Sequence, residues 1–262
     1  MSGNSFASLQ TVLDDAVAQY NTPDFIPHDP ISIPHRFSNA PDIEIAGLLA
    51  ATLAWGNRKM IIRNVNRLME WMDEAPYDFI RQHQERDLKR FEGFAHRTFN
   101  TTDLLHFIQF LRHHFQTHDS LEELFLNSEP IKEEAVVARG LVQFRKAFFA
   151  LEHAPARTQK HVASPERGSA CKRLNMFLRW MVRQDTGGVD FGIWKRLKPS
   201  QLIAPLDIHS GRTARQLGLL TRKQDDWKAA IELTENLRSF CPEDPVKYDF
   251  ALFSISVGNG KA

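Results

Sequence analysis

The chain has 262 residues, of which 42% are hydrophobic and 25% are charged, and its formal net charge is +1, a composition typical of folded globular proteins. Its two cysteines are too few for a disulfide framework or a four-cysteine zinc site, and no apolar stretch reaches the roughly 18 residues of a membrane span. Residues 1–10 lack the basic and apolar regions of a signal peptide, so we expect a cytoplasmic location and no membrane partner.

The N-terminal part of the chain predicts helices separated by one proline-rich loop. Residues 6–20 carry apolar side chains at helical spacing, whereas residues 21–39 contain four prolines and predict an extended loop. Residues 43–55 are apolar almost all round, which indicates a buried central helix with Asp42 as its N-cap. Gly56 and the residue after it end this helix, and residues 60–72 predict an amphipathic one.

A short polar turn separates these two helices. It contains Asn57, Arg58 and Lys59. Such a turn could contact a DNA backbone or wedge into a duplex, but it is equally well explained as a simple corner between helices. The sequence alone leaves both interpretations open.

The middle of the chain predicts further helices and contains a group of histidines. Residues 76–126 indicate two or three short helices, and residues 131–153 indicate another. A histidine-rich group could supply the metal ligands of a metal phosphohydrolase: His106, His113, His114 and His118 with Asp119. The group is local, however, and no second aspartate-rich motif accompanies it. A solvated helix face is therefore favoured, and we expect no metal and no cofactor.

The segment from 168 to 183 predicts the helix around which the rest of the chain is organised. An apolar stripe formed by Leu174, Phe177, Leu178 and Met181 indicates that it is amphipathic. Lys172 lies early in this helix and close to other cations, which makes it a candidate for a neutral amine nucleophile. The structural alternative is an ordinary surface lysine.

The C-terminal part combines an irregular segment with three more helices. Residues 185–205 are punctuated by glycine and proline, and Trp194 within them is best explained by core packing. Asp207 precedes a periodic run over 209–220 and is a natural N-cap. Helices are also predicted over 226–239 and 246–255, and no alternating strand pairs with hairpin turns are found anywhere in the chain. The predicted fold class is all-α.

Charge is distributed unevenly along the sequence. Residues 155–223 contain 14 Lys and Arg against four acidic residues, a balance of +10 in a chain whose total is +1. This basic segment includes both Lys172 and Asp207. It favours contact with a polyanion such as nucleic acid, and the alternative is a solvated basic surface.

Four segments together resemble an uncharacterised bacterial family, a domain of unknown function: residues 42–58, 168–183, 205–219 and 244–253. That family is in turn similar to the helix-hairpin-helix DNA glycosylases, the superfamily of endonuclease III and 8-oxoguanine glycosylase. The run from Gly168 to Asn175 resembles the end of the superfamily's hairpin, with Lys172 at the catalytic lysine. Leu206-Asp207-Ile208-His209, followed by an arginine-containing helix, resembles the element that carries its catalytic aspartate.

The resemblance implies a fold and an activity. The fold is a two-lobed helical unit of the helix-hairpin-helix glycosylase type over residues 1–262, with no substantial sheet and a cleft between lobes 40–154 and 1–39 plus 155–262. The activity is that of a DNA glycosylase, with possible abasic-site lyase activity, on double-stranded DNA with a modified base. Lys172 and Asp207 are the implied catalytic residues. The implied phosphate contacts are Asn57, Arg58, Lys59, Arg173, Arg179, Arg212 and Arg215, and the pocket candidates are Trp180, Trp194 and His209.

The sequence also departs from that superfamily. The usual Leu-Pro-Gly-Val-Gly hairpin turn is absent, the 35 positions from Lys172 to Asp207 exceed the usual spacing, and the four-cysteine iron–sulfur motif is missing. These departures favour an alternative, a non-catalytic DNA-binding protein with a glycosylase-like fold. RNA in place of DNA also stays open as the ligand.

Overall fold

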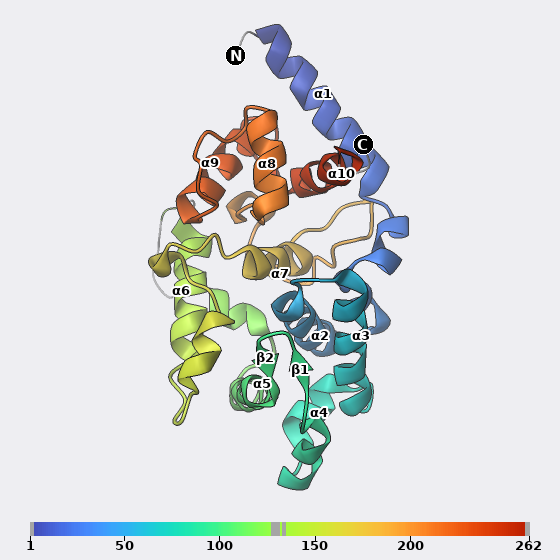
Figure 1. Cartoon of the computed structure of the whole chain (residues 1–262), viewed down its shortest axis with the longest axis vertical. Helices are drawn as coiled ribbons and strands as arrows, with labels where there is room; N and C mark the ends of the chain where they lie inside the picture. Colours follow the sequence, from blue (N-terminus) through green and yellow to red (C-terminus); the bar gives the residue numbers. More distant parts are fainter. Residues whose placement is uncertain (1–2, 127–131, 133–134, 260–262) are drawn as a thin grey trace. The chain divides into compact units, whose positions relative to one another are not determined.

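The computed structural model describes residues 3–126, 132 and 135–259. The chain divides into two compact units: unit 1 is Met1–Phe25, Ile131–Ala138 and Ser164–Ala262, and unit 2 is Ile26–Pro130 and Arg139–Ala163. Helices dominate both units (Figure 1), which confirms the predicted mostly helical class. The lobe boundaries and the cleft expected from the sequence stay predictions.

Unit 2 is built around a buried helix. Its helices are α2 (Ala40–Leu53), α3 (Arg58–Trp71), α4 (Pro76–Gln82), α5 (Thr101–His114) and most of α6 (Val136–Phe148). Residues 42–53 of α2 are all buried, as their uninterrupted apolar character predicts. Two short strands, β1 (Ala95–His96) and β2 (Phe99–Asn100), form an antiparallel pair. This small pair is consistent with the expected absence of a substantial sheet, and two-residue strands are too short to show an alternating pattern in the sequence.

The start of α2 differs from the prediction. Asn39, not Asp42, is the N-cap, and its side chain accepts a hydrogen bond from the backbone N–H of Asp42. The Asp42 carboxylate instead accepts from the backbone N–H of Tyr77 at 2.7 Å. Both residues favour N-cap positions, and the helix begins three residues earlier because a proline, Pro41, is accommodated in its first turn.

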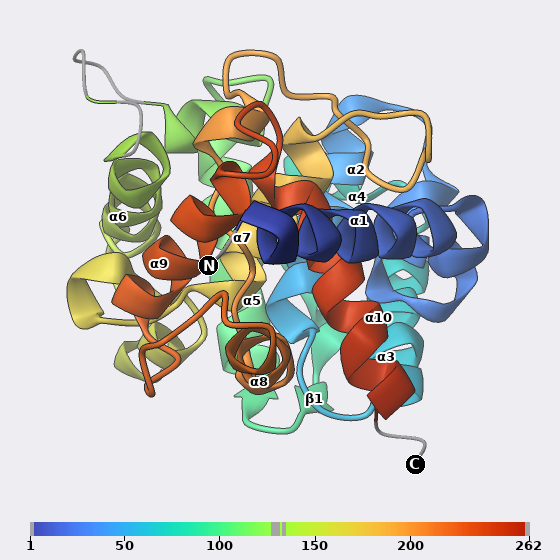
Figure 2. The ribbon, with the colours of Figure 1, turned by 90° about the horizontal axis from the view of Figure 1, so that it is seen from above.

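Unit 1 contains the segments that the sequence analysis singled out. Its helices are α1 (Gly3–Tyr20), α7 (Lys172–Val182), α8 (Ile208–Gln216), α9 (Trp227–Arg238) and α10 (Asp249–Asn259). Helix α10 packs against both α1 and α8, and Figure 2 shows α1 crossing over α10. A short 3-10 turn, Pro245–Tyr248, precedes α10. The side chain of Asp244, the N-cap residue of this turn, makes no cap hydrogen bond, and its carboxylate binds Arg183 instead.

The segment between α7 and α8 is irregular, as predicted, apart from a 3-10 turn at Pro199–Gln201. It folds back onto the end of α7. The backbone N–H of Phe191 donates to the carbonyl of Trp180 at 2.8 Å, and that of Trp194 donates to the carbonyl of Met181 at 2.9 Å. These bonds satisfy carbonyl groups that the end of a helix leaves without partners. The segment thereby fixes α7 in unit 1.

None of the helices that the structure describes has the length and apolar character required to cross a membrane.

Candidate functional site

A short, mostly irregular segment, residues 165–171, leads into α7. A 3-10 turn, Pro165–Arg167, ends at Gly168, whose φ of +73° lies in the left-handed region that favours glycine. The carbonyl of Gly168 accepts from the backbone N–H of Trp227 at 3.1 Å, and Ser169 bridges to Asp226. The loop before α9 therefore holds the segment from the side.

Cys171 makes the final turn into α7 in a strained conformation. Its φ is +51°, which is unfavourable for a residue with a side chain, and it is buried. Its backbone N–H bonds the hydroxyl of Ser169 at 3.2 Å, and its side chain does not cap the helix. Asn175, one turn into α7, donates to the carbonyl of Ala170 at 3.0 Å. The start of α7 is thus fixed from both sides of Cys171.

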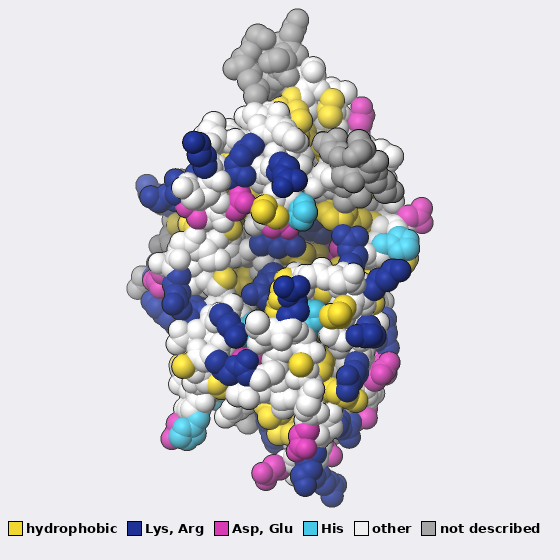
Figure 3. Space-filling model, viewed as in Figure 1, with side chains coloured by type: hydrophobic (Ala, Val, Ile, Leu, Met, Phe, Trp, Pro, Cys, Tyr) yellow, Lys and Arg dark blue, Asp and Glu magenta, His cyan; other side chains and the backbone are white. Residues whose placement is uncertain are grey.

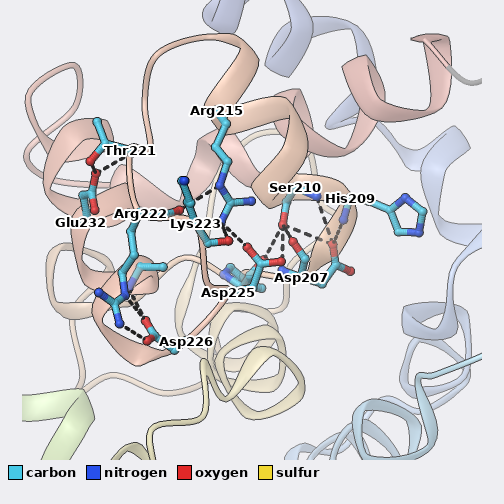
Figure 4. A network of polar contacts seen from close by, with 12 residues as sticks. Asp207, His209, Ser210, Arg215, Thr221, Arg222, Lys223, Asp225, Asp226 and Glu232 are labelled. Carbon is cyan, nitrogen blue, oxygen red and sulfur yellow. Dashed lines mark hydrogen bonds and ion pairs between the residues drawn. The ribbon is translucent and has the colours of Figure 1, made fainter.

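Lys172 and Asp207 begin two neighbouring helices of unit 1. Lys172 is the first residue of α7, and Asp207 is the N-cap of α8, as the sequence predicts. The Asp207 carboxylate accepts from the backbone N–H groups of His209 and Ser210 at 2.9 and 3.0 Å. The Ser210 hydroxyl accepts from the backbone N–H of Asp207 at 2.9 Å in return. Figure 4 shows this reciprocal capping arrangement.

The two side chains meet at the protein surface. The Nζ of Lys172 lies 3.6 Å from Oδ2 of Asp207, and the side chains are 31% and 37% exposed. The cap bonds use Oδ1, so Oδ2 is the oxygen that faces the amine. Burial works to raise the pKa of Asp207, but the charge of Lys172 and the bonds from Ser210 and His209 outweigh it and hold that pKa below its usual value. The pair is therefore an accessible amine beside an ionised carboxylate.

A buried network of ion pairs occupies the later turns of α7. Arg179 pairs with Asp190 through Nε at 3.3 Å and with Asp249 through Nη1. Arg183, which is 2% exposed, pairs with Asp190 at 2.9 Å. It also binds two further carboxylates, those of Asp185 and Asp244. Two guanidinium groups thus share four carboxylates. The sequence analysis missed this network.

The candidate phosphate contacts of unit 1 differ in accessibility. Arg179 is only 4% exposed and is held in the buried network, where it has a structural role. Arg173 is half-buried, and burial lowers its pKa to about 10, which leaves it charged at neutral pH. Arg215 braces the loop before α9, since it pairs with Asp225 at 2.6 Å (Figure 4). Arg212 is exposed on α8 and is the most accessible of the four.

The three pocket candidates also occupy different positions. Trp180 and Trp194 are 0% and 2% exposed, and the Trp194 ring packs edge-on against Phe177 at 5.3 Å. Both tryptophans therefore belong to the core of unit 1. His209 is exposed at the start of α8, where its ring points away from Asp207 in Figure 4. Next to it, Ile208 is 63% exposed, an unusual position for a large apolar side chain and one that sequence reasoning did not single out.

The remaining candidates, Asn57, Arg58 and Lys59, lie in unit 2. Asn57 caps α3, and its side chain accepts from the backbone N–H of Met60 at 3.1 Å. Arg58 and Lys59 are the first two residues of that helix and are exposed. Cations are disfavoured at a helix N-terminus, which already carries a partial positive charge. Arg58 and Lys59 therefore do not stabilise the start of α3, and a bound anion would offset their positive charge.

The histidines of unit 2 are used structurally where they are buried. His106 bonds the carbonyl of Phe148 at 3.0 Å, and His114 bonds that of Ser120 at 2.9 Å. Burial lowers the pKa of both rings. Within the residues that the structure describes, no group of three or more His, Cys, Asp or Glu side chains is placed to hold a metal ion.

Comparison with known proteins gives one match. The sequence profile of a family described as a protein of unknown function, DUF2400, matches residues 29–258. No curated protein and no solved structure matches the chain. The match spans most of the chain, including Lys172, Asp207 and Asp249, and its description gives no activity.

Proposed function

The chain belongs to the DUF2400 family, whose function is unknown, and we propose that it is a DNA glycosylase with abasic-site lyase activity that works through Lys172 and Asp207. One observation carries the proposal: an accessible amine at the start of α7 lies 3.6 Å from a carboxylate at the start of α8. Base excision with strand nicking needs these two groups, a nucleophilic amine and an anion that stabilises a positive sugar.

In this mechanism the target nucleotide leaves the duplex, because its C1′ is otherwise out of reach. As the glycosidic bond breaks, the base departs with the bonding electron pair, and positive charge develops on the sugar. The ionised Asp207, with its Oδ2 free of cap bonds, stabilises that charge. The Lys172 amine forms the new bond to C1′. It must first release a proton, because an ammonium group has no lone pair to donate.

The covalent intermediate then leads to strand cleavage. The bond between Nζ and C1′ becomes a Schiff base when the sugar ring opens. The Schiff base acidifies the neighbouring C2′–H, and loss of that proton expels the 3′ phosphate by β-elimination. Water then releases the lysine. No metal ion and no cofactor enters these steps.

Surface charge supports a polyanionic substrate. Lys and Arg side chains are prominent on the face drawn in Figure 3. Arg212 and His209 are exposed on the helix that Asp207 caps. Arg58 and Lys59 add positive charge at the N-terminus of α3. We propose Arg212, Arg58 and Lys59 as phosphate contacts, with Arg173 as a half-buried contributor.

Borohydride trapping tests the proposal. The native protein and Lys172→Ala are incubated with duplexes that carry an abasic site or one of a panel of modified bases, and the Schiff base is reduced to a stable adduct. We expect an adduct with the native protein and none with Lys172→Ala. The variant should keep its fold, because the pair is partly exposed and such ion pairs contribute about 1 kcal/mol or less.

The same assay separates the rival explanations. DNA binding without adduct or abasic product on any duplex would contradict the proposal and favour a non-catalytic DNA-binding protein. Activity that a chelator abolishes, and that Lys172→Ala leaves intact, would indicate a metal phosphohydrolase. Stronger competition by RNA than by DNA would identify RNA as the ligand.

A further inference from the structure

Asp249 is a partly buried carboxylate of unit 1, 15% exposed, that sequence reasoning did not find. It is the first residue of α10, and its carboxylate pairs with Arg179. Arg179 follows Lys172 by seven residues in α7, so the two lie two turns apart on the same face of that helix. Asp249 therefore contacts the helix that carries Lys172, on the side from which Lys172 projects.

The start of α10 is firmly held in this position. The guanidinium of Arg179 lies 4.4 Å from the ring centre of Phe250, the residue after Asp249. Helix α10 also packs against α8, the helix that Asp207 caps. Helix α10 thus contacts both helices that carry the candidate pair: α7, through the ion pair of Asp249 with Arg179, and α8.

The buried network contains too little positive charge for its carboxylates. Its members are Arg179 and Arg183 on one side and Asp185, Asp190, Asp244 and Asp249 on the other. Burial raises the pKa of Asp249. Arg179 and Lys172 oppose that rise, and the charges of Asp207 and Asp190 add to it. After Arg179, Lys172 is thus the next cation that acts on Asp249, and it acts from outside the network.

We propose that Asp249 is a positioning residue for Lys172, a second carboxylate that acts with Asp207 to hold the amine over the reaction site. The inference rests on the function proposed above and extends it. Two carboxylates on different helices restrict a flexible lysine more than one does, and a restricted nucleophile reacts faster with a substrate bound in place. Asp207 meets the substrate, whereas Asp249 acts through the lysine.

The test compares Asp249→Asn with Asp244→Asn in the full-length chain. Both substitutions remove one carboxylate of the same buried network, and the pKa of both carboxylates is raised by burial. The largest charge effects on Asp244 come from Arg183, Asp190 and Asp185, all members of the network, whereas Lys172 is among the largest on Asp249. Asp244→Asn is therefore a matched control for general damage to the network.

The readout is the reactivity of Lys172 without DNA. Trace labelling with acetic anhydride across a pH series, quantified on the Lys172 peptide by mass spectrometry, reports the fraction of amine that is unprotonated. Because the charges of Lys172 and Asp249 act on each other, removing the charge of Asp249 should shift the labelling profile of Asp249→Asn to lower pH. Asp244→Asn should leave the profile in place. An unshifted profile in Asp249→Asn, or equal shifts in both variants, would overturn the proposal.

A reciprocal measurement covers the case in which Asp249→Asn does not fold. In Lys172→Ala, which changes a partly exposed side chain, the titration of Asp249 is followed by carbon-13 NMR of its carboxyl group. Loss of the lysine charge should raise the pKa of Asp249 further. An unchanged titration would contradict the proposal. Neither measurement uses DNA, so a protein that traps no adduct but shows both shifts would refute the proposed activity and leave the coupling of Asp249 to Lys172 established.

Discussion

Helix α7 carries two sets of cations paired with carboxylates, and the two sets differ in how completely their charges are satisfied. Lys172, at its start, faces one oxygen of Asp207 at 3.6 Å, and both side chains are about one-third exposed. Arg183, near its end, is 2% exposed and binds three carboxylates. Cation–carboxylate pairing thus occurs once at the surface, with one carboxylate oxygen, and once around a buried arginine whose three nitrogens each bind a carboxylate.

This difference separates a site for chemistry from a structural network. A buried guanidinium that binds carboxylates through each of its three nitrogens holds its partners in place, whereas a partly exposed amine beside a single carboxylate oxygen can be approached by a substrate. Arg179 belongs with the buried set and Lys172 with the accessible one, although sequence reasoning grouped Arg179 with the phosphate contacts. Substitutions in each set should therefore differ in their effects on stability and on activity.

The largest expected effect on stability comes from the buried set. Arg183→Met removes the cation shared by the buried Asp190 and the partly buried Asp185 and Asp244. Removing one partner of a buried charge network destabilises a protein by about 3–5 kcal/mol. The free energy of unfolding, measured with denaturant, should fall by that amount. A loss below about 1 kcal/mol would show that the network is not structural.

At the accessible site, Asp207→Asn separates two roles of one residue. Asparagine caps helices about as well as aspartate, so the free energy of unfolding should change by less than about 0.5 kcal/mol. The substitution removes the charge that stabilises the sugar, and base excision should slow by about 100-fold or more. Single-turnover kinetics on the substrate found in the trapping panel measures the second effect. Full activity in this variant would show that Asp207 serves only as a helix cap.

The pH dependence of stability should have opposite signs at the two sites. The pKa of Asp207 is lowered in the folded protein, so its stabilising contribution is complete above about pH 4 and is lost as the pH falls through the folded pKa. Burial raises the pKa of Asp244 against the charge of Arg183. Its contribution is therefore complete below about pH 4 and is lost as the pH rises through the folded pKa.

Denaturant unfolding of the native protein, Asp207→Asn and Asp244→Asn between about pH 2 and pH 7 measures both signs. As the pH falls, the native protein should lose stability relative to Asp207→Asn. As the pH falls, the native protein should gain stability relative to Asp244→Asn. Two slopes of the same sign would contradict the contrast between the sites.

The smallest expected effect on stability concerns Cys171, the last residue before α7. Glycine relieves the left-handed backbone conformation by about 1 kcal/mol but removes a buried side chain, so Cys171→Gly should change the free energy of unfolding by less than about 1 kcal/mol. Cys171→Val, which places a branched side chain in the same conformation, should be clearly destabilising. Equal stability of the two variants would show that this conformation holds no strain.

The sequence predicted the parts of the site that depend on local patterns. The cap at Asp207 and the helix that begins near Lys172 follow from residue types within one or two turns, and the structure contains both. The buried helix α2 was equally clear, because its apolar run is uninterrupted. Its cap was misplaced since Asn39 and Asp42 both fit the local pattern, and only the contact of Asp42 with Tyr77 distinguishes them.

The buried network could not be predicted in this way. Arg183 pairs with Asp244, which is 61 positions away in the sequence, and Arg179 pairs with Asp249, which is 70 positions away. The residue pattern around the two arginines does not indicate that they are buried. A polar face on an amphipathic helix normally indicates solvent, so Arg179 was predicted to contact phosphate. Asp249 was missed for the same reason, since its partner Arg179 lies 70 positions away in the sequence, on α7.

The most direct test of the central claim is to locate the covalent bond. After borohydride reduction on the duplex that traps best, the adduct is digested and its peptides are mapped by mass spectrometry. We predict that the nucleotide remnant is on the peptide containing Lys172, and that the Lys172→Ala protein yields no adduct. A remnant on another lysine or on the N-terminal amine, or an adduct that persists in Lys172→Ala, would contradict the assignment of Lys172 as the nucleophile.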